Sequence, residues 1–166
     1  MNKISKICCL FIVCCVLFSC SKNDEPIVVS NGITNIKIYE NINEFTEIMD
    51  KLDKNDLVYV ADKKEISIKF NEEIPEDIHL SEYIIDENGN YKYSLDTAAK
   101  SIDVSMNGNK ASFTLEPNIA TLLSSNSNDY EKSATLKGYR MICEWKDGES
   151  EYLFVIKSDA AFINEE

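Results

Sequence analysis

The sequence predicts a mainly β protein, an antiparallel β-sandwich with one short N-terminal helix. From residue 57 onward, apolar and polar residues alternate, which is the period of a half-buried strand. Turn-forming pairs interrupt the alternation at Asn88-Gly89, Asn107-Gly108 and Asp147-Gly148. Helical spacing is confined to one early stretch. An immunoglobulin-like sandwich is one form of this fold, and the alternatives are an α+β antiparallel meander with the helix across one sheet, or a small β-barrel.

The chain opens with a leader. Lys3 and Lys6 precede an apolar segment, residues 7–18, which is followed by Ser19-Cys20. A positive start, a short apolar segment and a small residue before the cut are marks of a secretory signal peptide. About a dozen apolar residues are also too few to span a bilayer, which needs about 20.

Leu17-Phe18-Ser19-Cys20 resembles a bacterial lipobox. The resemblance implies that the leader is cut before Cys20 and that the Cys20 thiol carries lipid. We therefore expect three parts in the chain: a signal peptide over residues 1–19, a lipidated tether over 20–31, and a single β-rich extracytoplasmic domain over 32–166.

Two further short motifs resemble features of Bacteroidota-type surface lipoproteins. Residues 20–26, Cys-Ser-Lys-Asn-Asp-Glu-Pro, are similar to their export tag, although Asn23 stands where those tags often carry an acid. Asp96-Thr97-Ala98 is similar to their O-glycosylation tripeptide, which implies Thr97 as a modified residue. Together these motifs imply a protein anchored by its lipid to the outer membrane and exposed at the cell surface.

The mature chain begins with short strands and a helix. Ile27-Val28-Val29 is the expected first strand, before a turn at Asn31-Gly32, and Ile36 and Ile38 share one face of the next strand. Residues 42–53 form the expected helix, capped by Asn41 with Glu44 as its box partner. Its apolar stripe is Ile42, Phe45, Ile48, Met49 and Leu52.

The remaining elements are expected to be strands joined by tight turns. Residues 57–61 and 65–70 form two strands across a turn at 62–64, with Ile66, Ile68 and Phe70 on one face. A first hairpin spans residues 83–95 and pairs Tyr83-Ile84-Ile85 with Tyr91-Lys92-Tyr93.

Two more hairpins have predicted registers. In the second hairpin, Val104 lies opposite Ala111 and Ile102 opposite Phe113. The third spans residues 133–158 and should be covered on both faces. Its predicted pairs are Cys143 with Tyr152, Met141 with Phe154, Tyr139 with Ile156 and, on the other face, Ile142 with Leu153.

Residues 117–132 are expected to form the one long irregular stretch of the domain. Its serine, asparagine and aspartate residues are typical of turns and lack any strand or helix period. A sandwich offers ligands its loops and edges, because its inner faces are filled by the core. This stretch is therefore the candidate binding loop, through Ser124, Asn126, Asn128, Asp129 and Tyr130.

The charge of the chain limits its possible partners. The chain has 29 acidic and 17 basic residues, so nucleic acid is excluded as a partner. Removing the two leader lysines moves the formal net charge from −12 to −14.

The mature chain is not expected to form a disulfide. Of six cysteines, four lie in the leader and Cys20 takes lipid, which leaves Cys143 without a disulfide partner. Because Cys143 alternates with Met141 and Trp145, we expect a buried thiol.

No catalytic residue, metal site or cofactor is predicted. His79 is the single histidine, and the loop Asp86–Asn90 lacks the spacing of a calcium loop. Trp145 and Tyr93 continue the inward patterns of their strands, so we expect them in the core.

The expected function is a non-catalytic binding or accessory module for a protein or a glycan. The alternatives are an inhibitor or immunity-type partner and a glycan-active enzyme using paired carboxylates.

Overall fold

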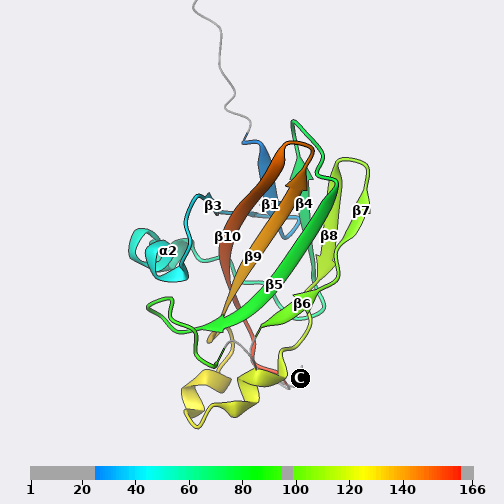
Figure 1. Ribbon diagram of the computed structural model, residues 1–166. Helices are drawn as coiled ribbons and strands as arrows, with labels where there is room; N and C mark the ends of the chain where they lie inside the picture. The colour runs from blue at the N-terminus through cyan, green and yellow to red at the C-terminus, as the bar shows by residue number, and fades with distance from the viewer. Residues whose placement is uncertain (1–24, 95–98, 162–166) are drawn as a thin grey trace, which may run out of the picture.

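The computed structural model describes residues 25–94 and 99–161 and confirms the predicted antiparallel β-sandwich (Figure 1). Its two five-stranded sheets pack face to face around one main core. The first sheet has the order β2 (Asn35–Ile36), β1 (Ile27–Ser30), β4 (Glu65–Phe70), β8 (Lys110–Thr114), β7 (Ser105–Asn107). The second sheet has the order β3 (Ile38–Glu40), β10 (Gly148–Ser158), β9 (Thr135–Trp145), β5 (Asp77–Ile85), β6 (Lys100–Ile102).

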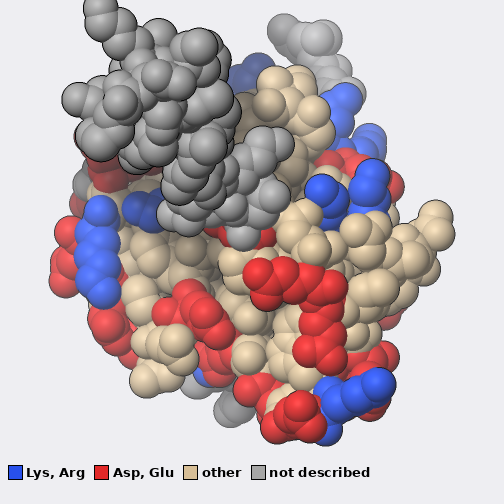
Figure 2. Space-filling model, turned by 90° about the horizontal axis from the view of Figure 1, so that it is seen from above, with Lys and Arg blue, Asp and Glu red and all other residues tan. Residues whose placement is uncertain are grey.

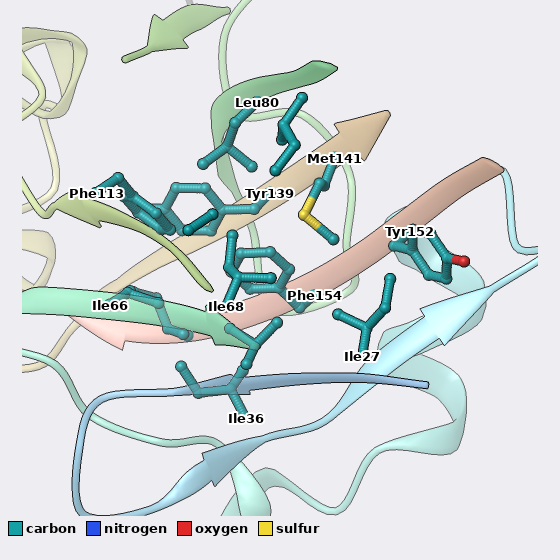
Figure 3. Packing of buried hydrophobic residues seen from close by; sticks show 14 of the residues in the cluster. Ile27, Ile36, Ile66, Ile68, Leu80, Phe113, Tyr139, Met141, Tyr152 and Phe154 are labelled. Atoms are coloured by element: carbon teal, nitrogen blue, oxygen red, sulfur yellow. The ribbon is translucent and has the colours of Figure 1, made fainter. Parts of the chain in front are cut away.

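The core between the sheets consists of the alternating apolar residues that the sequence places on one face of each strand. Ile66, Ile68 and Phe70 of β4 are all buried, as predicted. Figure 3 shows Ile66 and Ile68 among the packed core side chains. From the second sheet, the Tyr139 and Phe154 rings stack with their centroids 4.8 Å apart. Burial of these side chains supplies the main favourable term for folding.

Helix α2 (Phe45–Lys51) covers the outer face of the second sheet. Phe45 and Ile48 pack there against Leu153 and Val155 of β10 and form a second apolar cluster. Residues 152–156 of β10 are therefore all buried, which confirms that this hairpin is covered on both sides. None of the helices in residues 25–94 and 99–161 has the length and apolar character needed to cross a membrane.

The helix boundaries differ from the prediction. The helix begins at Phe45 rather than Ile42, its N-cap is Glu44, and the Glu44 side chain makes no capping hydrogen bond. Asn41 has a φ of 58° and lies in the loop before the helix. The predicted capping box is wrong because Asn41 takes up the left-handed conformation that lets the chain turn out of β3.

Two segments that read as continuous in the sequence are divided between the sheets. Lys37 separates β2, which pairs with β1, from β3, which pairs with β10. Likewise, β6 pairs with β5 in the second sheet, whereas β7 pairs with β8 in the first. The predicted pairing of Ile102 with Phe113 is therefore wrong, because Ile102 lies opposite Leu80. Alternation places a residue on the core face of either sheet without specifying which sheet.

The third hairpin is confirmed, but its register differs from the prediction. Met141 lies opposite Tyr152 and Tyr139 opposite Phe154, because the two-residue loop is Lys146-Asp147. Gly148 follows that loop as the first paired residue, with a φ of 143°. The shift moves each partner by two residues, so every side chain keeps its predicted face. Arg140, rather than Ile142, therefore faces Leu153.

The second hairpin shows the same kind of shift. Its loop is Gly108-Asn109, so Met106, rather than Val104, lies opposite Ala111. Gly108 has a φ of 61° and Asn109 does not have a positive φ. Glycine at the first central position is the type II′ arrangement, whereas the predicted loop placed glycine second.

The first predicted hairpin is not a paired ladder. β5 instead pairs with β9 and β6, and Tyr91 forms a single bridge to Ile85. The loop between them closes because the Asp86 Oδ1 atom accepts the backbone N–H groups of Asn88 and Asn90, both at 2.9 Å. Asp86 therefore organises a turn.

Gly89 in that turn is required by its surroundings. It has a φ of 86°, and a Cβ atom there would lie 2.5 Å from the backbone of Phe45. The turn thus packs against the start of α2 so closely that no side chain fits.

Residues 57–61 do not form the predicted strand of a hairpin with β4. Tyr59 makes one parallel bridge to Lys157, through hydrogen bonds that join Val58 and Val60 to Lys157. β3 pairs with only three residues of β10. The segment 57–61 lies beyond them along β10, where β3 leaves backbone N–H and C=O groups of β10 to pair with it. A short 3-10 helix, η2 (Lys54–Asp56), precedes it.

Candidate functional site

The loop over residues 117–132, here called the distal loop, lies at the end of the sandwich opposite Glu25, where the described chain begins (Figure 1). It contains two 3-10 turns, η3 (Ile119–Leu123) and η4 (Ser127–Tyr130). The Asn118 and Asn126 side chains cap these turns by accepting backbone N–H groups. The expectation of an irregular stretch is therefore wrong, because local side-chain caps order it.

The five predicted binding residues of this loop lie together and bond largely to one another. Asp129 accepts hydrogen bonds from Ser124 and, at 2.5 Å, from Lys92 Nζ. These bonds lower the pKa of Asp129, with the Lys92 bond as the larger cause. The Tyr130 hydroxyl lies 2.7 Å from the Ser124 carbonyl oxygen. Asn126 caps η4, and the exposed Asn128 lies within that turn. These polar groups therefore shape the loop.

The loop also exposes apolar side chains. Ile119 is 75% exposed and Leu123 is 65% exposed, and Leu122 and Tyr130 are exposed as well. Exposed apolar side chains that gather on one loop make that loop a candidate interaction surface. Sequence reasoning missed this apolar group because the loop was interpreted from its polar residues. The available signal was the run Ile119 to Leu123 in a segment without strand period.

A buried polar network holds the distal loop to the second sheet. Asn118 Nδ2 donates to Glu82 Oε1 at 2.9 Å, and the Tyr139 hydroxyl donates to Glu82 Oε2 at 2.6 Å. Burial, followed by the Glu82 charge, raises the pKa of Tyr139 well above its ordinary value. In the middle of η3, Thr121 Oγ1 accepts a hydrogen bond from the backbone N–H of Ala161.

Lys137 completes the network. Its ammonium nitrogen lies 3.0 Å from the Glu116 carbonyl oxygen, 3.5 Å from Asp62 Oδ1 and 3.8 Å from Glu82 Oε2. The side chains of Lys137 and Glu82 are both 0% exposed. Sequence reasoning missed this pair. The available signal was a charged residue, Glu82 in β5 and Lys137 in β9, at a strand position that the alternation assigns to the core. Buried charges must be paired, so this network fixes the base of the distal loop.

A pocket of about 370 Å³ lies at the other end of the sandwich. It lies between the start of β1, the end of β4 and the β9–β10 turn, and acidic side chains are prominent at this end (Figure 2). The described residues that line it include no lysine or arginine. Its main side chains are Glu72, Glu73, Trp145, Asp147, Glu149 and Tyr152. Trp145 is half-buried and packs edge-on against Phe70, so the prediction that it belongs to the core holds only in part.

Cys143 and His79 do not form a nucleophile and base pair. Cys143 is fully buried between the sheets, and burial raises the pKa of its thiol to about 12. The prediction of a buried free thiol is confirmed. His79 lies on the outer face of the same sheet, opposite Ile142, and hydrogen-bonds to Glu144.

Two predicted modification sites, Cys20 and Thr97, lie outside the described residues. Neither a model of a known protein family nor any curated protein matches this chain.

Proposed function

We propose that this protein is a non-catalytic, lipid-anchored surface protein that binds a protein partner through its distal loop. The observation that supports this is the exposed apolar group of Ile119, Leu122, Leu123 and Tyr130 on a loop held by buried hydrogen bonds. Burying one leucine side chain in an interface is worth about 1.5–3 kcal/mol, so a few such residues can carry much of a binding free energy.

The chemistry of the loop favours a protein over a glycan. Ile119, Leu122 and Leu123 are aliphatic, so Tyr130 is the one flat ring in this apolar group on which a sugar could stack. Exposed amide side chains, Asn126 and Asn128, lie on the neighbouring turn η4. An apolar centre beside polar groups is the usual composition of a protein interface. Because the loop is already ordered, little conformational entropy is lost when it binds.

Anchoring through Cys20 would place the loop where a partner can reach it. The described chain begins at Glu25, shortly before β1, and the distal loop lies at the opposite end of the sandwich from the start of β1 (Figure 1). The negative charge of the chain also disfavours contact with anionic lipid. The distal loop would then face away from the membrane. An inhibitor or immunity-type protein would use the same surface.

Acylation of Cys20 predicts a distinct outcome. Replacing Cys20 with alanine should release the protein from the membrane fraction, because the thiol that would carry the lipid is gone. Mass spectrometry of the native protein should find a lipid-modified Cys20 at its N-terminus. A Cys20→Ala variant that stays in the membrane fraction would show that the anchor lies elsewhere.

Loss of the apolar group should abolish partner binding. We expect the double variant Leu122→Ser, Leu123→Ser to reduce capture of the partner by tenfold or more, since two central apolar contacts are lost. The measurement is chemical cross-linking on intact cells that carry the protein, followed by recovery and quantification of the cross-linked partner. The midpoint of thermal unfolding should change little, because both side chains are exposed.

Ile33→Ser is the matched control, because Ile33 is a 93% exposed apolar residue outside the distal loop. This variant should capture the partner normally. Unchanged capture by the Leu122→Ser, Leu123→Ser variant would contradict the proposal. The second candidate, a glycan held against Trp145 in the acidic pocket, would then be favoured by the aromatic and carboxylate lining of that pocket.

A further inference from the structure

Asp77, His79 and Glu144 bring three metal-binding atoms together on the outer face of the second sheet. His79 Nε2 lies 2.9 Å from Glu144 Oε1 and 3.7 Å from Asp77 Oδ2. The three donor atoms all lie within 4.8 Å of one another. Within residues 25–94 and 99–161, this is the one group of histidine, cysteine or acidic side chains that converges so closely. We propose that these three residues bind a divalent transition-metal ion, with zinc as the best fit.

The strand register explains why the donors converge. Asp77 and His79 are two residues apart on β5, so both side chains point away from the core. Glu144 lies on β9 directly opposite Asp77. β5 and β9 are inner strands of the five-stranded sheet, paired on both sides over part of their length. At the donors themselves β5 pairs with β9 alone, because β6 pairs only with residues 80–82 of β5. The β5–β9 pairing fixes Asp77 opposite Glu144, which lowers the ordering cost of binding an ion.

The distances suit zinc. Zinc binds nitrogen and carboxylate oxygen at about 2.0–2.2 Å, so two donors of a tetrahedral site lie about 3.4 Å apart. The observed separations of 2.9 and 3.7 Å bracket that value, and small side-chain rotations would reach it. An imidazole nitrogen among the donors favours zinc over calcium, which takes six to eight oxygen ligands.

The exposure of the group determines what kind of site it forms. The His79 side chain is 60% exposed, so an ion can enter from solvent without any movement of the backbone. Three protein donors leave the fourth position of a tetrahedral ion open to water or to a donor from another molecule. The negative net charge of the chain raises the local concentration of cations. This inference depends neither on the distal loop nor on the lipid anchor.

A zinc titration of the metal-free purified protein tests the site. Isothermal titration calorimetry should show saturable binding of one zinc ion per chain. The single histidine gives one set of imidazole NMR signals, and these should shift as the ion binds. His79→Ala should weaken zinc binding by more than tenfold, and Asp77→Asn and Glu144→Gln should each weaken it by about tenfold or more.

Glu149→Gln is the matched control, because Glu149 lies opposite Glu144 on β10 but outside the converging group. This variant should bind zinc like the parent protein. Zinc should raise the thermal unfolding midpoint of the parent and not that of His79→Ala, and the midpoints without zinc show that each variant is folded. Unchanged binding by His79→Ala, or equal weakening by Glu149→Gln and Glu144→Gln, would show only diffuse attraction to acidic groups and overturn the proposal.

Discussion

Replacing Lys137 with methionine should lower the free energy of unfolding by about 3–5 kcal/mol. Methionine retains most of the volume of lysine, so the loss is mainly that of the charge. The change leaves Glu82, which is fully buried, without the nearby positive charge that its carboxylate faces at 3.8 Å. Domains of this size are stable by about 5–15 kcal/mol, so the variant should be close to unfolding under mild conditions. Urea denaturation followed by tryptophan fluorescence measures the difference.

Lys100→Met is the control for this prediction. Lys100 forms an ion pair with Glu116 at 3.1 Å, but that pair is largely exposed to solvent. Exposed pairs contribute about 0–1 kcal/mol, so this variant should unfold at nearly the parent urea concentration. Adding Glu82→Gln to Lys137→Met should restore part of the lost stability, because no unpaired buried charge remains. A loss below about 1 kcal/mol for Lys137→Met would show that the network is not important for stability.

Phe45→Ala should also lower the free energy of unfolding by about 3–5 kcal/mol, the usual cost of truncating a buried phenylalanine. Phe45 is fully buried between α2 and the second sheet. Its ring lies over Gly138 and contacts Tyr83 and Tyr91, with ring centroids 5.9 and 6.0 Å away. Removing the ring leaves a cavity that the neighbouring strands cannot close. Chemical denaturation measures the loss.

Hydrogen exchange should locate the effect of Phe45→Ala. The amides of α2 should lose protection more than those of β4, because the helix is held to the sheet mainly through this apolar cluster. Glu47→Ala is the matched control, since Glu47 is exposed on the same helix, and it should change stability by less than about 0.5 kcal/mol. Equal stability of the parent protein and Phe45→Ala would mean that the cluster does not hold the helix in place.

The buried network that Lys137→Met disrupts also supports the distal loop, the proposed binding surface. Asn118 of the loop donates to Glu82 of the second sheet, and Lys137 of that sheet donates to the carbonyl oxygen of Glu116, just before the loop. We therefore expect Lys137→Met to disturb the distal loop as well as overall stability. The Leu122→Ser, Leu123→Ser variant should affect only the exposed surface. Comparing the two separates loss of a binding surface from loss of the support beneath it.

By itself, the sequence determined the fold class and which side chains face the core. Alternation with a period of two is a local property, so Ile66, Ile68 and Phe70 were placed correctly before any partner strand was known. The same alternation predicted the buried thiol of Cys143. Even where hairpin registers were shifted, as for Met141, the faces remained right because the shift preserved the alternation.

Only the tertiary structure decided which strands are neighbours and which polar groups meet. The chain changes sheets at Lys37, and nothing in its alternation marks that change. Glu144 joins His79 although 65 residues separate them, and Lys137 joins Glu82 inside the core. Side-chain period depends on the local backbone, whereas strand pairing depends on the summed free energy of contacts between distant segments. The buried network and the proposed metal site both arise from that second kind of information.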